Sequence, residues 1–155
     1  MIDKKNTEKL IKKEYTIVKE EPFPSLGISI GLPNQNDYFK WDIIIFGPDD
    51  SIYAGGIFKM RIKFDQAFPL TIPNVKFVTK IHHCNVSDEG DVKIPSLQKW
   101  KENISMSQVL SDIFSLFYVQ NPDKEFNSEI SNEYLNDRPS FESKARKYTQ
   151  KYASF

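Results

Sequence analysis

The spacing of apolar residues predicts a helix near the start of the chain, over residues 7–18. Its apolar residues recur three and four positions apart, so they share one helix face, while three lysines and Glu14 lie among the remaining positions. Pro22 and Pro24 cannot continue a helix, which ends the element before them. The predicted buried positions are Leu10, Ile11, Tyr15 and Val18.

Four later stretches predict β-strands, over residues 27–31, 39–46, 57–64 and 74–79. The clearest is 57–64, where Phe58, Met60, Ile62 and Phe64 alternate with basic residues, as in a strand buried on one side. Gly55-Gly56 before it indicates a bulge or a close backbone approach. Because short turns join the strands in sequence order, they are expected to pair as an antiparallel meander.

Helices are expected again after an irregular stretch over 81–104. Ser105 and Gln108 have the spacing of a capping box, and the apolar residues over 109–117 predict a central helix against the sheet, which Asn121-Pro122 ends. A short helix over 129–135 and a last one follow. The last is capped by Asp137, has Pro139 in its first turn, and carries an apolar stripe of Phe141, Ala145, Tyr148 and Tyr152. The order of elements predicts an α+β domain with helices on one sheet face.

Length and charge narrow the class of protein. At 155 residues the chain fits one domain, over 1–155. Its 21 basic and 21 acidic residues cancel, so nothing in the overall charge favours nucleic acid or a membrane surface over a protein partner, and neither is expected to bind. Its one cysteine cannot form an internal disulfide, and neither a membrane span nor a signal peptide is recognisable, so we expect a cytoplasmic or nuclear protein. Nothing indicates a cofactor.

The candidate chemistry lies in residues 80–94. His83-Cys84-Asn85 is followed, eight residues after the asparagine, by Lys93. This segment resembles the active site of the ubiquitin-conjugating enzymes, the E2 family, where His-Pro-Asn precedes by the same spacing the cysteine that carries ubiquitin as a thioester. In this chain Cys84 stands at the proline position and Lys93 at the cysteine position.

The resemblance extends from about residue 7 to residue 153 and rests on several family positions in the right order. It implies the UBC-like fold, with a four-stranded meander packed by a central helix, an N-terminal helix and two C-terminal helices. It also implies a place in ubiquitin or ubiquitin-like conjugation. The matching positions are Trp41, 47–51, 53–58, Phe64, Phe68-Pro69, Pro73, 75–81, His83, Asn85, Trp100, 121–123 and 147–153.

The family reaction is difficult to reconcile with Lys93. An acyl carrier needs a polarisable nucleophile that also leaves readily, and a donor for the developing oxyanion. Asn85 stands where the family places its structural and oxyanion-related asparagine, but a lysine side chain is protonated at neutral pH in water. Once acylated it would form an isopeptide, which is a poor leaving group, so the carrier step would stop.

Other positions depart from the family pattern as well. Lys124 stands at the acidic position near the end of the Asn-Pro-Asp segment, where a lysine would not help to deprotonate an incoming amine, although Asp123 is adjacent. In the ligase-contact loops, residues 101–103 differ from the common Ser-Pro-Ala, and Ile72 replaces a proline. An engineered cysteine-to-lysine change would explain Lys93 alone. The combination therefore favours natural divergence.

This segment also contains two alternative candidate sites. Cys84 is a candidate for a relocated nucleophile, because the neighbouring His83 could favour the reactive thiolate, but a buried residue filling a proline site is the preferred interpretation. His82, His83 and Cys84 do not predict a metal site, because a structural zinc requires four ligands and the chain has no other His or Cys. His83 is expected to fix the loop through a hydrogen bond to backbone.

The resemblance also implies binding surfaces. Lys9, Lys12 and Lys13 correspond to the basic helix surface that meets the activating enzyme, although a solvated helix face explains them equally well. Phe68, Leu70 and Trp100 correspond to the loops that contact ligases. Ser29 falls on the sheet surface that binds ubiquitin non-covalently in some members, but an exposed strand serine is the preferred interpretation.

Three functions remain open from the sequence. The leading hypothesis is a non-catalytic E2 variant that binds ubiquitin, a ubiquitin-like modifier or an active E2 partner, with an activating enzyme or a ligase as further candidate partners. The alternative is an active ubiquitin-conjugating transferase, either through Cys84 or because the natural residue at 93 is cysteine. The third is a scaffold that has left the pathway.

Overall fold

Alternation of apolar and polar residues produces a sheet with one buried and one exposed face in the computed structural model, which describes residues 3–124 and 126–154. Four strands pair in sequence order, and every neighbouring pair is antiparallel, which confirms the predicted meander. The strands are β1 (Ile28–Gly31), β2 (Lys40–Phe46), β3 (Ile57–Lys63) and β4 (Asn74–Phe77).

The register brings the large apolar side chains of the two central strands together. Trp41 is opposite Ile62, and Ile43 is opposite Met60. All four side chains are fully buried, as the alternation predicted. Val75 and Phe77 of β4 are also buried on this face. The inner face of the sheet is therefore one wall of the core, and burial of its apolar area stabilises the fold.

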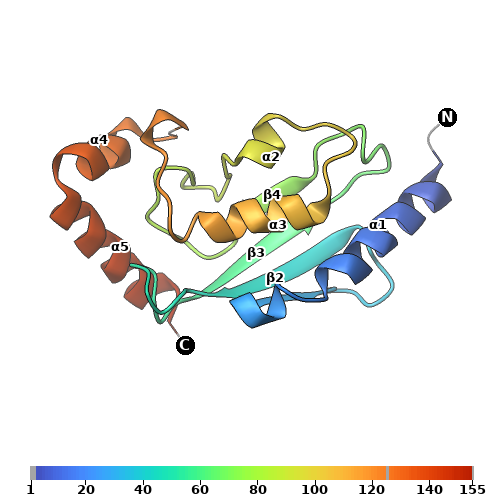
Figure 1. Cartoon of the computed structure of the whole chain (residues 1–155), viewed down its shortest axis with the longest axis horizontal. Coiled ribbons are helices and arrows are strands. Elements are labelled where there is room, and N and C mark those ends of the chain that lie inside the picture. The colour runs from blue at the N-terminus through green and yellow to red at the C-terminus, as the bar shows by residue number, and fades with distance from the viewer. Residues whose placement is uncertain (1–2, 125, 155) are drawn as a thin grey trace.

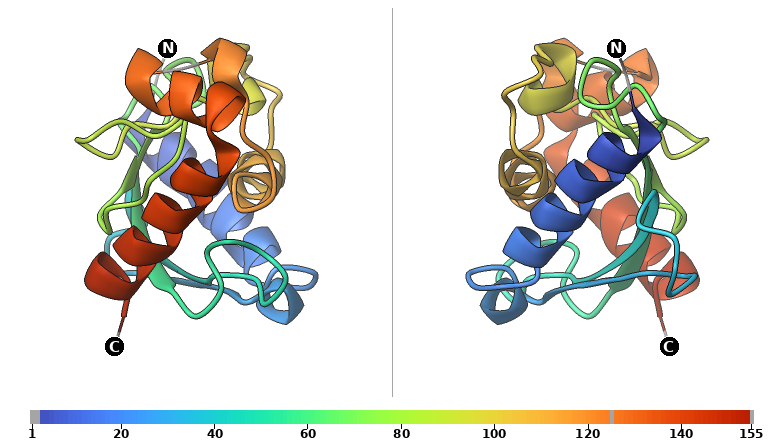
Figure 2. Two further views of the ribbon diagram at one scale, coloured as in Figure 1. Left: turned by 90° about the vertical axis from the view of Figure 1, so that its left-hand side faces the viewer. Right: turned by 90° about the vertical axis from the view of Figure 1, so that its right-hand side faces the viewer.

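Helices form the other wall. They are α1 (Lys4–Val18), α2 (Pro95–Gln98), α3 (Met106–Ser115), α4 (Ser128–Asn136) and α5 (Arg138–Tyr152), with short 3₁₀ turns η1 (Pro24–Leu26) and η2 (Pro122–Lys124). α3 runs across the inner face of the sheet, α1 lies at one end of it and α4 and α5 at the other (Figure 1). The side views place α1 and α3 on one side of the sheet, with α5 running past its end (Figure 2), and the predicted α+β fold class is confirmed.

Capping explains where two of the helices begin. Ser105 and Gln108 form the predicted capping box at the start of α3, with both reciprocal hydrogen bonds present. α1 begins at Lys4, three residues earlier than predicted, because the Asp3 side chain accepts a hydrogen bond from the Lys5 amide. The short helix α2 was not predicted. Its start is set by Pro95, which is favourable in a first helical turn.

The predicted stripe on the last helix was partly wrong. Phe141 and Ala145 are fully buried, but Tyr148 and Tyr152 are more than one third exposed. Thr149 is buried instead, and its hydroxyl donates to the Ala145 carbonyl at 2.8 Å. A threonine can enter an apolar interface this way, because a helix carbonyl satisfies its only donor.

Gly56 permits the close approach of α5 to the start of β3. A Cβ at this position would lie 2.6 Å from both the Phe58 ring and the Thr149 methyl group. Next to it, the Ile57 amide donates to the Ala153 carbonyl at 2.8 Å, which ties the end of α5 to the sheet. The close backbone approach expected at Gly55-Gly56 is thus confirmed. None of the helices in the described part of the chain is long and apolar enough to cross a membrane.

We expect Gly56→Ala to destabilise the protein by about 1–3 kcal/mol, because the added methyl group overpacks the contact between α5 and β3. Gly31→Ala is the matched control, since a Cβ there meets nothing within 4 Å. Urea unfolding at neutral pH measures the free energy of unfolding of both variants. Equal stability of the two variants would contradict the assigned role of Gly56.

Candidate functional site

The segment over 80–94 is held against the edge of the sheet as a small folded loop. Val86 and Val92 form an isolated antiparallel bridge, and Phe77 donates its amide to the Gly90 carbonyl at 2.9 Å. Gly90 has a φ of 92°, and a Cβ there would lie 2.1 Å from the Phe77 carbonyl oxygen, so the turn requires glycine. This loop fixes the backbone positions of Asn85 and Lys93.

His83 is a fully buried anchor of this loop. Its Nε2 donates to the Leu116 carbonyl at 2.6 Å, its Nδ1 accepts from the Asn85 amide at 2.9 Å, and its ring stacks on Tyr53. Burial lowers its pKa to about 4, so the ring is neutral at physiological pH. This geometry agrees with the loop-fixing role expected from the sequence, and both ring nitrogens are used by the backbone.

His82 connects the same loop to the last two helices. Its Nε2 lies 3.0 Å from Oε1 of Glu133, whose other oxygen accepts from Lys144 at 2.6 Å and from Ser140 at 2.9 Å. Burial lowers the pKa of His82, although Glu133 opposes the shift. Burial alone would raise the pKa of Glu133, but the hydrogen bonds from Lys144, His82 and Ser140 outweigh it and lower the pKa.

Asn85 joins the loop to η2. Its side-chain nitrogen donates to the Asn121 carbonyl at 2.7 Å and to the Lys124 carbonyl at 2.8 Å, and its oxygen accepts from the Asn121 amide at 2.9 Å. An asparagine amide has two donor hydrogens, and both are engaged here. Stabilising an oxyanion would require one of these bonds to be given up, so the observed geometry is that of a structural link.

Cys84, which was only a candidate for a relocated nucleophile, is almost fully buried. The residue is 1% exposed, its amide donates to Oε1 of Gln120 at 2.8 Å, and its carbonyl accepts from the Phe126 amide. A thiol that accepts an acyl group must be reachable by the incoming carbonyl carbon. The burial therefore agrees with the interpretation of Cys84 as a packing residue.

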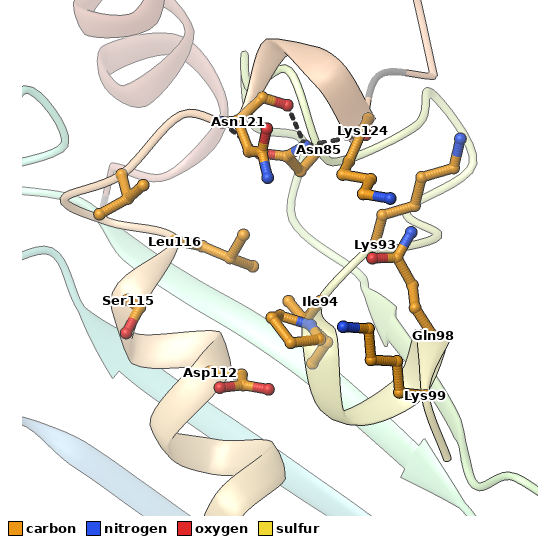
Figure 3. Close-up of a pocket in the computed structure, with 12 residues that line it drawn as sticks. Asn85, Lys93, Ile94, Gln98, Lys99, Asp112, Ser115, Leu116, Asn121 and Lys124 are labelled. Atoms are coloured by element: carbon orange, nitrogen blue, oxygen red, sulfur yellow. Dashed lines mark hydrogen bonds between the residues drawn. The ribbon is translucent and has the colours of Figure 1, made fainter.

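Lys93 is half-buried on the wall of a groove of about 610 Å³ (Figure 3). Its amide donates to the Asn85 carbonyl at 3.0 Å, so its backbone is tied to the loop. Its Nζ lies 4.4 Å from the centre of the Phe126 ring, a cation–π distance. Lys124, from η2, and Lys99, beside α2, line the same groove, and Figure 3 shows them on opposite sides of it.

The groove therefore has a basic rim and a partly apolar floor. Ile94, Leu116 and Val119 contribute apolar surface, and Asp112 is its one carboxylate among the described lining residues. Oδ2 of Asp112 accepts from the Ser96 amide at 2.8 Å, in the first turn of α2, so this carboxylate helps to hold the wall of the groove. Figure 3 shows Asp112 across the groove from Lys93, so no carboxylate of the described lining residues lies beside residue 93 as a base.

The residues assigned to the ligase-side loops lie together, away from this groove. Nε1 of Trp100 donates to the Pro69 carbonyl at 2.9 Å, and the Trp100 and Phe68 rings are 5.9 Å apart. Phe68 is buried, while Leu70 is 62% exposed. A hollow of about 250 Å³ joins this loop to α1. Leu70 is thus the most exposed of the three residues, while Trp100 is half-buried.

The other predicted surfaces are also exposed. Lys9, Lys12 and Lys13 are exposed on α1, although Nζ of Lys12 also lies 5.4 Å from the Tyr38 ring. Ser29 is exposed on the outer face of the sheet, opposite Ile44. These positions are open to partners, and nothing in the fold assigns a partner to them.

Sequence reasoning missed the residues that brace the loop from behind. Nε2 of Gln120 donates to the Tyr53 hydroxyl at 2.8 Å, and that hydroxyl donates to the His82 carbonyl at 2.7 Å. Gln120 lies in a polar connection after a helix, where no periodicity marks it. Within the described ranges, no group of three His, Cys, Asp or Glu side chains could hold a metal ion.

His83 predicts a specific pH dependence of stability. Because its pKa is lowered from 6.5 to about 4 in the folded protein, the unfolded chain takes up the proton first as the pH falls. The contribution is complete above the unfolded pKa and is lost progressively down to about pH 4. We expect His83 to account for a loss of about 2 kcal/mol between pH 7 and pH 5.

Urea unfolding of the wild type and His83→Gln at several pH values isolates this contribution. Glutamine does not titrate, so the variant should show a shallower pH dependence whatever its stability at pH 7. Parallel curves for the two proteins would contradict a neutral buried His83.

Comparison with known proteins agrees with this architecture. The family model of the ubiquitin-conjugating enzymes matches residues 10–149. The chain is 35% identical over 150 residues to ubiquitin-conjugating enzyme E2 14 of Schizosaccharomyces pombe, an alignment that covers 96% of this chain and 95% of the yeast protein. The match includes the loop, the groove and η2. The chain therefore belongs to the ubiquitin-conjugating enzyme family, and its α+β structure is the UBC fold of that family.

Proposed function

We propose that this family member acts by binding ubiquitin, a ubiquitin-like modifier or an active conjugating enzyme, and that it does not carry the modifier itself. The observation that supports this most directly is an amine at residue 93, held in the family frame by the hydrogen bond between its amide and the Asn85 carbonyl. A thioester needs a thiolate that attacks and then leaves. An amine that accepted the acyl group would keep it as an amide.

The surroundings of residue 93 support the same proposal. The two donor hydrogens of the Asn85 amide are engaged by the Asn121 and Lys124 carbonyls, which reduces what they offer to a reacting carbonyl group. Lys124 brings a positive charge where proton abstraction from an incoming lysine would need a base. Cys84 is buried, which argues against its use as a substitute carrier.

Binding requires surface that is both exposed and distinct from the groove. Leu70 at the tip of the ligase-side loop and Ser29 on the outer sheet face meet this condition, and α1 presents Lys9 and Lys13. In this proposal these surfaces meet the activating enzyme, a ligase, the modifier or a second conjugating enzyme. Capture of partners from native lysate on the immobilised protein would identify which of them it engages.

The decisive test is incubation with activating enzyme, ATP and ubiquitin, followed by electrophoresis with and without reductant. We expect no adduct that reductant removes. An adduct that survives reductant would be an isopeptide and would agree with the proposal, because the acyl group is then trapped. A reducible adduct that disappears in Cys84→Ala would overturn it in favour of catalysis through Cys84.

The Lys93→Cys variant tests whether the site differs from that of an active conjugating enzyme in more than its nucleophile. We expect this variant, with Cys84→Ala to exclude a second thiol, to discharge ubiquitin to free lysine at least about 100-fold more slowly than an active conjugating enzyme, because general base catalysis is missing. Single-turnover discharge measures this rate. Discharge at the rate of the active enzyme would indicate that the natural residue at 93 is cysteine.

A further inference from the structure

An exposed tyrosine is held in place just beyond the end of α3. The Tyr118 amide donates to the Ser115 carbonyl at 3.0 Å, so the chain makes a further turn after the helix. Figure 1 shows this end of α3 next to the connection between β2 and β3, and the Tyr118 hydroxyl donates to Oδ1 of Asp50 in that connection at 2.8 Å. Tyr118 is 50% exposed, so its ring is presented to solvent in a defined position.

A second aromatic ring supports the first. Phe114 lies four residues earlier, in the last turn of α3, and the two ring centres are 5.6 Å apart in an edge-to-face arrangement. Phe114 is half-buried and packs against the hydrophobic core. Aromatic side chains are enriched at protein interfaces relative to the rest of the surface. The ring pair is therefore a candidate contact surface.

Negative charge lies beside these rings. Asp49 and Asp50 are both exposed. The hydrogen bond to Asp50 raises the pKa of Tyr118, and the negative charges of Asp50 and Asp49 act in the same direction. In the described part of the chain no Lys, Arg or His side chain pairs with either carboxylate, and the C-terminal end of α3 adds a partial negative charge. The local potential is therefore negative, although the whole chain has no net charge.

We call Asp49, Asp50, Phe114 and Tyr118 the aromatic–acidic patch. An aromatic ring face and a carboxylate both attract a cation. Arginine suits this combination better than lysine, because its planar guanidinium stacks on a ring and donates several hydrogen bonds at once. Tyr118 uses only Oδ1 of Asp50, so the other oxygen of Asp50 and the Asp49 carboxylate can accept from a ligand. The phosphates of a nucleic acid would be repelled here.

The patch is separate from the surfaces described above. The described residues that line the groove include Ser115 and Leu116, but neither Phe114 nor Tyr118. Asp49 and Asp50 lie in the connection that follows β2 and are not part of a strand, so they do not belong to the outer sheet face. Within the described residues, the two carboxylates also belong to no group of three side chains that could hold a metal ion.

We propose that the aromatic–acidic patch binds an arginine-bearing segment of a partner protein. The guanidinium lies over the exposed Tyr118 ring and donates to the carboxylates of Asp49 and Asp50. This contact goes beyond the proposed function, because it does not use residue 93, and it would hold whether or not the protein carries ubiquitin.

The test uses a fluorescein-labelled peptide in which adjacent arginines are flanked by glycines and serines, titrated with the full chain. We expect Asp49→Asn together with Asp50→Asn to weaken binding by about tenfold or more, and added salt to weaken binding to the wild type. The matched control is Asp88→Asn together with Glu89→Gln, which removes the same charge from another exposed acidic turn. The control should bind as the wild type does. Equal loss of binding in the two double variants would overturn the proposal.

Two substitutions of Tyr118 test the role of the ring. Tyr118→Phe keeps the ring and loses only the hydrogen bond to Asp50, so we expect its affinity to stay within about twofold of the wild type. Tyr118→Ala removes the ring and should weaken binding by about fivefold. Circular dichroism checks that both variants fold. Unchanged binding by Tyr118→Ala would overturn the proposal, and so would tighter binding of a peptide with lysines in place of the arginines.

Discussion

The side-chain amide of Asn85 joins two segments that are 36 residues apart in the chain and that together form the groove. Its side chain makes two hydrogen bonds with the backbone of Asn121 and one with the Lys124 carbonyl in η2, and the Lys93 amide donates to the Asn85 carbonyl, so both walls are tied to this residue. Asn85 itself is 2% exposed, and removing its side-chain amide would lose three part-buried hydrogen bonds, at a cost of about 0.5–1.5 kcal/mol each. Such a link supports the fold independently of any reaction at the site.

Because the contacts that hold the loop do not involve the side chain at residue 93, a lysine can occupy that position. His83 and Asn85 hold the loop through side-chain hydrogen bonds to backbone groups, and Gly90 does so by allowing a close approach to the Phe77 backbone. The side chain at 93 contributes to none of those contacts, and its ammonium instead rests on the Phe126 ring. The structure of the loop therefore does not depend on which side chain stands at residue 93.

Periodicity predicted the sheet and the central helix well, because alternation along β2 and β3 and the capping box at Ser105 are local signals. Periodicity failed where contacts with residues distant in the chain decide which side chains are buried. Tyr148 has the spacing of a buried residue, yet Thr149 is buried, because Gly56 admits its methyl group at the start of β3. The resemblance to the family located Asn85 and Lys93, but Gln120 and Glu133 act through tertiary contacts that no sequence pattern marks.

The contacts of Glu133 with His82, Lys144 and Ser140 determine whether the chain could be shortened at its C-terminus. His82, in the loop beside the groove, packs its ring against Phe141 and Tyr148. It also lies in contact with Glu133, which pairs with Lys144. The two C-terminal helices therefore cover one side of the loop. Without them an imidazole and part of the apolar core would face water. These helices are consequently an integral part of the domain, and a chain that ended before residue 128 would have to rebuild the loop around different contacts.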